Sequence, residues 1–110
     1  MEDMGSDAEV TGGVGTRLLF ENDRVRIWEV RLAPGERGDL HRHEFDHVLV
    51  QIAGDRVAVE PDPSTAGPYK DYFEGDIGPG LAVFVPKGGV ETAVNVGTQP
   101  YLEIVVELKD

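Results

Sequence analysis

The stretch GERGDLHRHEFDHVLVQIAG, residues 35–54, contains all three histidines of the chain, His41, His43 and His47. Its first half is polar and contains glycine, whereas its second half is apolar, which is typical of a short strand and a turn followed by a longer strand. On an extended chain, His41 and His43 project from the same face because they are two residues apart. We expect the turn to bring His47, on the next strand, close beside them.

The remainder of the chain predicts an all-β domain. From Arg17 onward, short apolar or β-branched runs alternate with turns rich in Gly, Pro, Asp and Asn, which favours a sandwich or barrel. The predicted strands are 17–20, 25–32, 40–43, 47–53, 56–60, 69–73, 82–85, 91–96 and 101–108. In the last strand, we expect the even-numbered face, from Leu102 to Leu108, to be the buried one.

The chain length and its first residues predict one folded domain. Residues 1–16 are rich in acidic residues and glycine, so we expect a flexible lead-in before a single domain at residues 17–110. The first residues are acidic and polar, unlike a secretory signal, and the longest apolar runs have about five residues, too few for a membrane span. These features favour a cytoplasmic protein.

The charge balance limits the possible partners. The chain has 10 Lys and Arg against 21 Asp and Glu, a net charge of -11, which disfavours nucleic acids and anionic membranes. A small molecule is therefore the expected ligand. The chain has no cysteine, so any metal must bind to nitrogen and oxygen atoms. Imidazole is a suitable ligand for zinc, copper, iron and nickel, and three imidazoles within seven residues favour a metal site.

Two spacing patterns resemble the motifs of the cupin superfamily. The first runs Gly35, five residues, His41, one residue, His43, three residues, His47, six residues, Gly54. The second runs Gly80, five residues, Pro86, one residue, Gly88, two residues, Glu91, three residues, Asn95. Each pattern departs from the family at one position, because the family has glutamate in place of His47 and histidine in place of Glu91.

The resemblance implies a cupin jelly-roll barrel, which is a double-stranded β-helix. It also implies one divalent transition metal, such as Fe, Ni, Mn or Zn, held by His41, His43, His47 and Glu91, with the glutamate and one histidine exchanged between the motifs. Three neutral imidazoles and one carboxylate give a divalent ion a net charge of about +1, as in the unexchanged arrangement. The other motif residues have structural roles, and they are Gly35, Gly54, Gly80, Pro86, Gly88 and Asn95.

Further residues are candidates for the cavity or for packing. Gln51 shares the face of His47, and Tyr69 and Tyr72 lie in the connection where cupins place groups that contact substrate. We expect Trp28 and Phe84 to pack in the core or at an interface. The arginines, Arg26 among them, are expected to face solvent.

The sequence leaves two classes of function open. The first is a metal-dependent enzyme acting as an oxygenase, isomerase or lyase on a small polar metabolite, although no catalytic acid or base is identified. The second is a module that binds or senses a metal or small ligand without turnover. We also expect a homodimer, because an acidic barrel of this size has exposed edge strands.

Overall fold

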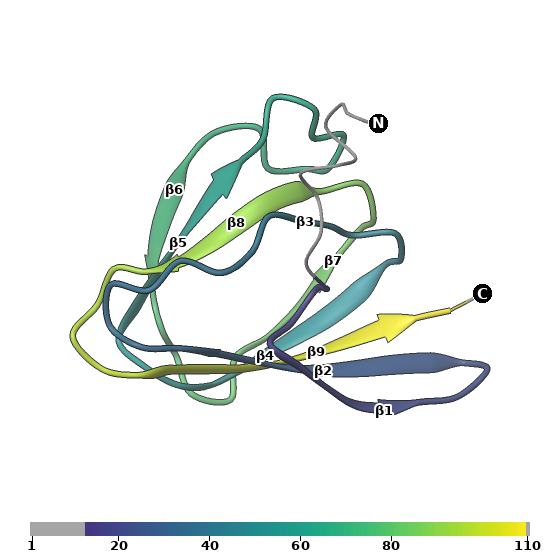
Figure 1. Ribbon diagram of the computed structural model, residues 1–110, viewed down its shortest axis with the longest axis horizontal. Helices are drawn as coiled ribbons and strands as arrows, with labels where there is room; N and C mark the ends of the chain where they lie inside the picture. Colours follow the sequence, from purple (N-terminus) through teal and green to yellow (C-terminus); the bar gives the residue numbers. More distant parts are fainter. Residues whose placement is uncertain (1–12, 110) are drawn as a thin grey trace.

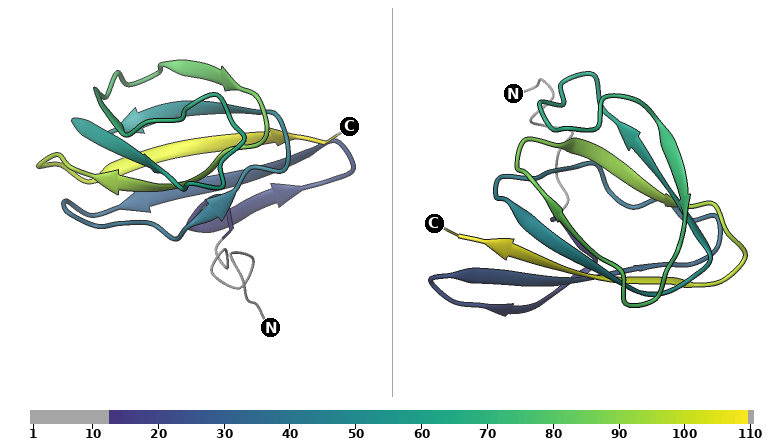
Figure 2. Two further views of the ribbon diagram at one scale, coloured as in Figure 1. Left: turned by 90° about the horizontal axis from the view of Figure 1, so that it is seen from above. Right: turned by 180° about the vertical axis from the view of Figure 1, so that it is seen from behind.

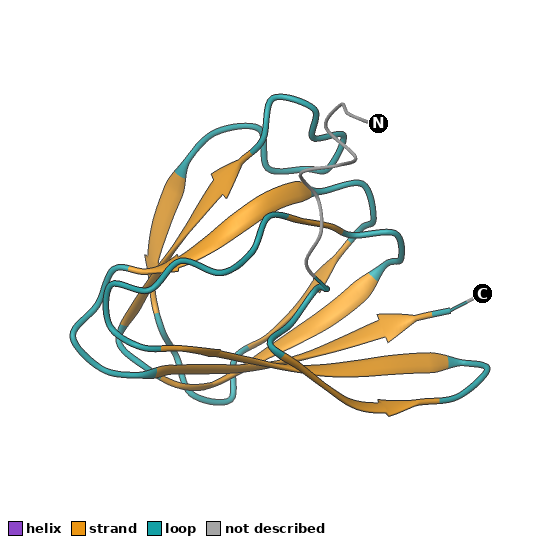
Figure 3. Ribbon diagram, in the orientation of Figure 1, coloured by secondary structure: helices purple, strands orange, loops and turns teal. Residues whose placement is uncertain are grey.

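The computed structural model describes residues 13–109 of the 110-residue chain. Within this range the chain forms nine strands and no helix, and the strands make two antiparallel sheets (Figures 1 and 3). The larger sheet has the order β1 (Arg17–Glu21), β2 (Val25–Leu32), β9 (Tyr101–Leu108), β4 (His47–Ala53) and β7 (Ala82–Val85). The smaller has the order β3 (His41–Arg42), β8 (Val90–Asn95), β5 (Arg56–Pro61) and β6 (Phe73–Asp76).

The two sheets face each other in a jelly-roll arrangement, most easily followed in the rear view of Figure 2. The all-β, single-domain fold predicted from the sequence is therefore confirmed. Among the residues that the structure describes, no helix is long and apolar enough to cross a membrane.

The sequence placed one strand wrongly. The strand predicted at 69–73 is β6, and it starts only at Phe73 and ends at Asp76. The reason is electrostatic, because Arg56 on the paired strand β5 forms ion pairs with both Glu74 and Asp76. The pairing is thus supported by charged side chains on an edge strand, and a search for apolar runs does not detect it.

The face of β9 that points inward is the opposite of the one expected. Tyr101, Val105 and Glu107 are at most 2% exposed, whereas the residues from Leu102 to Leu108 on the even-numbered face are only partly buried. The even face is apolar and yet forms the outside of the larger sheet. Apolar character alone pointed to the wrong side, because the inward face carries Glu103 and Glu107, and the partners of Glu107 lie on β2.

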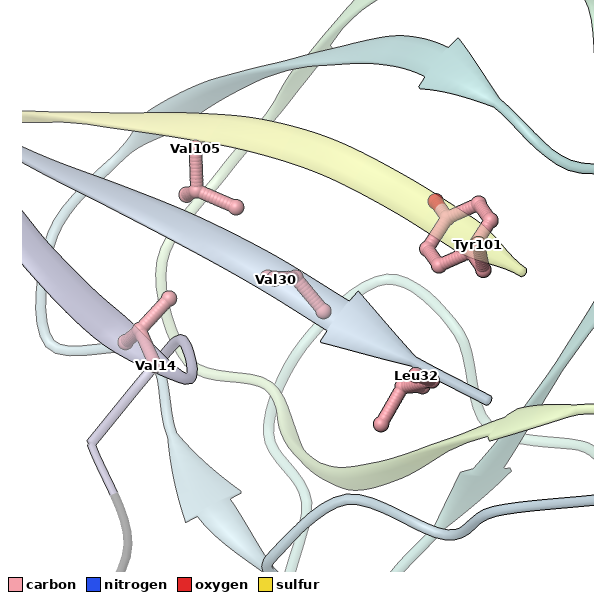
Figure 4. Packing of buried hydrophobic residues seen from close by; sticks show 5 residues of the cluster. All are labelled: Val14, Val30, Leu32, Tyr101 and Val105. Carbon is pink, nitrogen blue, oxygen red and sulfur yellow. The ribbon is translucent and has the colours of Figure 1, made fainter. Parts of the chain in front are cut away.

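The core lies between the sheets and is made by Val14, Val30, Leu32, Tyr101 and Val105 (Figure 4). Val14 falls within the segment expected to be flexible, and residues 13–16 instead pack on the barrel. A Cβ atom at Gly13 or Gly15 would lie 2.6 Å from atoms of Trp28, so these glycines allow the close approach that buries Val14. Residues 1–12 of the predicted lead-in lie outside the described residues.

The predicted structural residues of the two motifs terminate strands. All four motif glycines have positive φ values, which are 83° at Gly35, 127° at Gly54, 86° at Gly80 and 112° at Gly88. At Gly54, a side chain would be strained and would also meet the ring of Tyr101 at 3.0 Å. Pro86 directly follows the last residue of β7.

Asn95 is fully buried and joins the end of β2 to the connection between β8 and β9. Its side-chain amide donates hydrogen bonds to the backbone carbonyls of Leu32, at 3.0 Å, and Gln99, at 2.8 Å. Its side-chain carbonyl accepts a hydrogen bond from the amide of Gly97 at 2.9 Å. The structural role predicted for this residue is consistent with these contacts.

We predict that Asn95→Ala lowers the free energy of unfolding by about 2–4 kcal/mol, because it removes the donor to the carbonyl of the buried Leu32 and to that of Gln99 and opens a cavity. Chemical denaturation would measure the change. Asn22→Ala is the matched control, since the exposed Asn22 side chain also makes two hydrogen bonds, to the amides of Arg24 and Val25. Equal losses in both variants would contradict the role assigned to Asn95.

Candidate functional site

The four predicted metal ligands come from both sheets. His41 on β3 is directly paired in register with Glu91 on β8. His43 follows β3, and its backbone amide donates to the carbonyl of Gly89 at 2.8 Å, which holds the chain beside β8. His47 is the first residue of β4 in the larger sheet. The turn between β3 and β4 therefore brings the third histidine back to the first two, as expected from the sequence.

Three of the four residues form a tight group. The Nε2 atoms of His41 and His43 are 3.1 Å apart, and Glu91 Oε2 lies 3.4 Å from His43 Nε2 and 3.9 Å from His41 Nε2. One donor atom from each of these residues lies within 4.8 Å of the other two, so the group could hold a metal ion. The ring of His47 stacks on that of His43 with centroids 4.0 Å apart.

Backbone carbonyls fix the orientation of two of the rings. His41 Nδ1 lies 3.0 Å from the carbonyl oxygen of Asp39, and His47 Nδ1 lies 3.1 Å from that of Phe45. Because a carbonyl can only accept, Nδ1 must carry the hydrogen in both rings. In the neutral rings Nε2 then has a free lone pair, which is the arrangement found in metal-binding histidines. The donor set therefore fits a divalent cation.

Burial sets the protonation of these groups. It lowers the pKa of both His41 and His47, and the neighbouring His43 lowers them further. Burial alone would raise the pKa of Glu91, but the hydrogen bond from His43 and the nearby imidazoles outweigh it and hold that pKa below its usual value. Near neutral pH the two rings are neutral and the carboxylate is charged, which are the states that metal binding requires.

A cavity of about 180 Å³ lies beside these residues. All four predicted ligands line it, together with aliphatic side chains that include Val30, Leu49, Val57, Val83 and Val105. The site therefore combines a small polar group with a largely apolar interior. This is the usual composition of a pocket for a small molecule.

No protein-family model matches the sequence, and no curated protein matches it. Solved structures match the fold. A cupin domain from Bordetella pertussis has a TM-score of 0.71 and 21% identity, and the match covers 90% of this chain and 100% of that one. The chain has the cupin fold. A Cupin 2 conserved barrel domain protein from Salinispora arenicola gives a TM-score of 0.60 at 18% identity, covering 86% of this chain and 73% of that one.

A third cupin neighbour is a sugar phosphate isomerase from Silicibacter pomeroyi. Its TM-score is 0.54 at 24% identity, and the match covers 79% of this chain and 52% of that one. At these identities the likeness concerns the fold, so the site of this protein has to be argued from its own residues.

The three residues that the sequence suggested for the cavity differ in position. Gln51 is buried and lines the cavity, where its side-chain carbonyl accepts a hydrogen bond from the amide of Gly78 at 3.0 Å. Tyr69 also lines the cavity. Tyr72 is not among the residues that line it, because its side chain is exposed and its hydroxyl donates to Glu74 at 2.6 Å.

Two acidic residues of the interior were missed from the sequence because they lie on the misassigned face of β9. The first is Glu107, which is fully buried. Its Oε1 accepts hydrogen bonds from Arg26 Nε at 2.5 Å and Trp28 Nε1 at 2.7 Å. The expectation that Arg26 faces solvent was therefore wrong, because the buried carboxylate of Glu107 draws the guanidinium inward.

The second missed residue is Glu103, which lines the cavity. Its Oε2 accepts a hydrogen bond from the hydroxyl of Tyr101 at 2.7 Å. Burial raises the pKa of Glu103 to about 7, even though the hydrogen bond from Tyr101 opposes the rise. A titrating carboxyl group in an apolar cavity is typical of a functional site.

This pKa predicts a change of stability with pH. Burial raises the pKa of Glu103 to about 7 in the folded protein, whereas the unfolded side chain has its ordinary pKa of 4.5. Stability present at low pH is therefore lost as pH rises through this window. We expect Glu103→Gln to gain about 2 kcal/mol over wild type between about pH 5 and pH 8, measured by chemical denaturation. The exposed Glu44→Gln serves as control, and a pH-independent difference would contradict the shift.

Proposed function

We propose that the protein is a metal-binding cupin that holds one divalent transition metal through His41, His43, His47 and Glu91 and binds a small molecule beside it. The observation that carries the proposal is the convergence of donor atoms from His41, His43 and Glu91 within 4.8 Å beside an apolar cavity. Imidazole nitrogen and carboxylate oxygen are compatible with Fe, Ni, Mn or Zn. His47 completes the set from the opposite sheet.

When bound, such a metal would supply Lewis-acid chemistry to a molecule in the cavity. The chain itself would contribute the shape of the cavity, the exclusion of water and the titrating carboxyl group of Glu103. A metal site and a titrating acid in one cavity favour an enzyme of the isomerase, lyase or oxygenase type. A binding module without turnover is the alternative, and the presence of Glu103 in the cavity argues for the enzyme.

The residues that line the cavity indicate which class of small molecule it would bind. The sequence suggested a polar metabolite, whereas most of the cavity wall is aliphatic, so the proposed ligand is mainly apolar with polar groups at its ends. The net charge of -11 supports a small molecule over a nucleic acid or an anionic membrane. A cytoplasmic location remains part of the proposal.

We predict that untagged protein purified without chelators contains about one equivalent of metal by elemental analysis. His43→Ala and Glu91→Gln should each bind it at least about tenfold more weakly, because each removes a donor atom or its charge. Glu44→Gln is the matched control for Glu91→Gln, since it removes the same charge from an exposed position between the histidines. Wild-type protein that neither contains nor takes up metal would overturn the proposed site.

We also propose that two copies associate through the outer face of the larger sheet. Support comes from β4, β7 and β9, whose outward residues are apolar and include Ile52, which is 42% exposed, and Phe84, which is 57% exposed. An exposed apolar sheet face is typical of a surface that a partner covers. An uncharged face is also where two chains of net charge -11 repel each other least.

We predict a dimer by light scattering at micromolar concentration and a monomer for Phe84→Asp, because a charge on this face would be buried without a partner. Phe20→Asp is the control. Phe20 is also exposed, at 52%, but lies on the edge strand β1 away from β4 and β7. A wild-type monomer, or dissociation by both variants alike, would refute the proposed interface.

A further inference from the structure

We infer that Glu103, Tyr101 and Gln51 form a second ligand-binding end of the cavity, which we call the Glu103 end, where the carboxyl group of Glu103 donates a hydrogen bond to a neutral oxygen of the bound molecule. The oxygen is a carbonyl or hydroxyl oxygen on a mainly apolar ligand. The inference rests on the proposed use of the cavity for a small molecule, but it does not require the metal.

The register of the larger sheet places this end away from the candidate metal ligands. His47 pairs with Glu107, and Gln51 pairs with Glu103, so the two levels are four residues apart on both β4 and β9. At about 3.3 Å per residue they are separated by roughly 13 Å along the strands. Between them, Leu49 and Val105 line the cavity. The cavity therefore has a polar group at each end and an apolar middle.

The hydrogen bonds at the Glu103 end run in one direction. The amide of Gly78 donates to Gln51 Oε1, so the amide nitrogen of Gln51 is the group left to hydrogen-bond Tyr101. The hydroxyl of Tyr101 in turn donates to Glu103 Oε2 at 2.7 Å. Since Oε2 already accepts this hydrogen, the proton of a neutral Glu103 belongs on Oε1. The chain of donors thus ends in an O–H group at the cavity.

No lysine or arginine of the described residues is among the groups that set the charge of Glu103. Tyr101 hydrogen-bonds it, His43 favours its ionised form from further away, and Glu91 opposes ionisation. The neighbouring strand β2 presents Val30 directly opposite it, and β4 presents Gln51. With its pKa near 7, a substantial fraction of Glu103 carries a proton at neutral pH and can donate it in a hydrogen bond.

Size and charge define the ligand class. A cavity of about 180 Å³ is comparable to the roughly 150 Å³ cavity known to hold benzene, so one ring of carbon atoms fits. An anionic group at the Glu103 end would be repelled by the ionised fraction of Glu103 and by the net negative charge of the protein. A neutral ketone or alcohol of one-ring size matches both constraints.

The test uses cyclohexanone and methylenecyclohexane, which have nearly the same shape but differ in whether they offer a hydrogen-bond acceptor. Binding to metal-free protein would be followed by chemical-shift changes of backbone amides in the wild type and two variants. Glu103→Gln retains a donor, because its amide oxygen can accept from Tyr101 and its NH₂ group can face the ligand. Glu103→Leu removes the donor and keeps a similar volume.

We expect cyclohexanone to bind the wild type and Glu103→Gln with similar affinity and Glu103→Leu about fivefold more weakly, with little change for methylenecyclohexane. Raising the pH through about 7 should weaken cyclohexanone binding to the wild type but not to Glu103→Gln, which keeps the test valid if the leucine variant does not fold. Absence of cyclohexanone binding below this pH, or a pH response shared by both proteins, would overturn the inference.

Repeating the titration with zinc-loaded protein separates this inference from the proposed function. If the protein takes up zinc but Glu103→Leu binds cyclohexanone as the wild type does, the metal site stands and the inference fails. If the protein does not take up zinc but the Glu103 variants behave as expected, the inference stands and the metal proposal fails. The exposed Glu44→Gln, at a residue outside the cavity lining, should leave the metal-free binding of cyclohexanone unchanged.

Discussion

The register of β9 between β2 and β4 is the constraint on which the interior depends. β9 pairs along its whole length with β2, from Val25 opposite Leu108 to Leu32 opposite Tyr101, and along most of its length with β4. Because side chains alternate between faces, a shift of one residue would move all its inward side chains to the outside. Such a shift would move the core residues Tyr101 and Val105 out of the interior, together with Glu103 and Glu107. Core packing and site chemistry are therefore fixed by the same backbone pairing.

This strand supplies two interior carboxyl groups with different surroundings. Glu107 forms an ion pair with the guanidinium of Arg26 and also accepts a hydrogen bond from Trp28, so its negative charge is balanced by a direct contact. Glu103 has a tyrosine hydroxyl as its hydrogen-bond partner and aliphatic side chains around it, so burial favours its neutral form. Two identical side chains four residues apart thus provide a structural ion pair and a titrating acid.

The sequence predicted the parts of this molecule that depend on local chemistry. Turn residues and apolar runs located the nine strands, with β6 displaced, and the motif spacing identified four glycines that all adopt positive φ. It also predicted that the loop after His43 returns His47 to the same cavity. The sequence did not predict the inward face of β9, because both faces of this strand carry large side chains. A buried glutamate there is stabilised only by partners from β2, such as Arg26 and Trp28. Such compensation between distant residues leaves no trace in the local pattern.

The same register gives a physical reason for the exchange of residue types between the two motifs. His47 is directly opposite Glu107, and both side chains are buried on the same face. A glutamate at position 47, as in the motif that the sequence resembles, would place two buried carboxylates side by side, and like charges directly opposite are destabilising. Histidine at 47 removes this repulsion. A carboxylate at 91 instead lies beside the imidazoles of His41 and His43, and the hydrogen bond from His43 favours its ionised form.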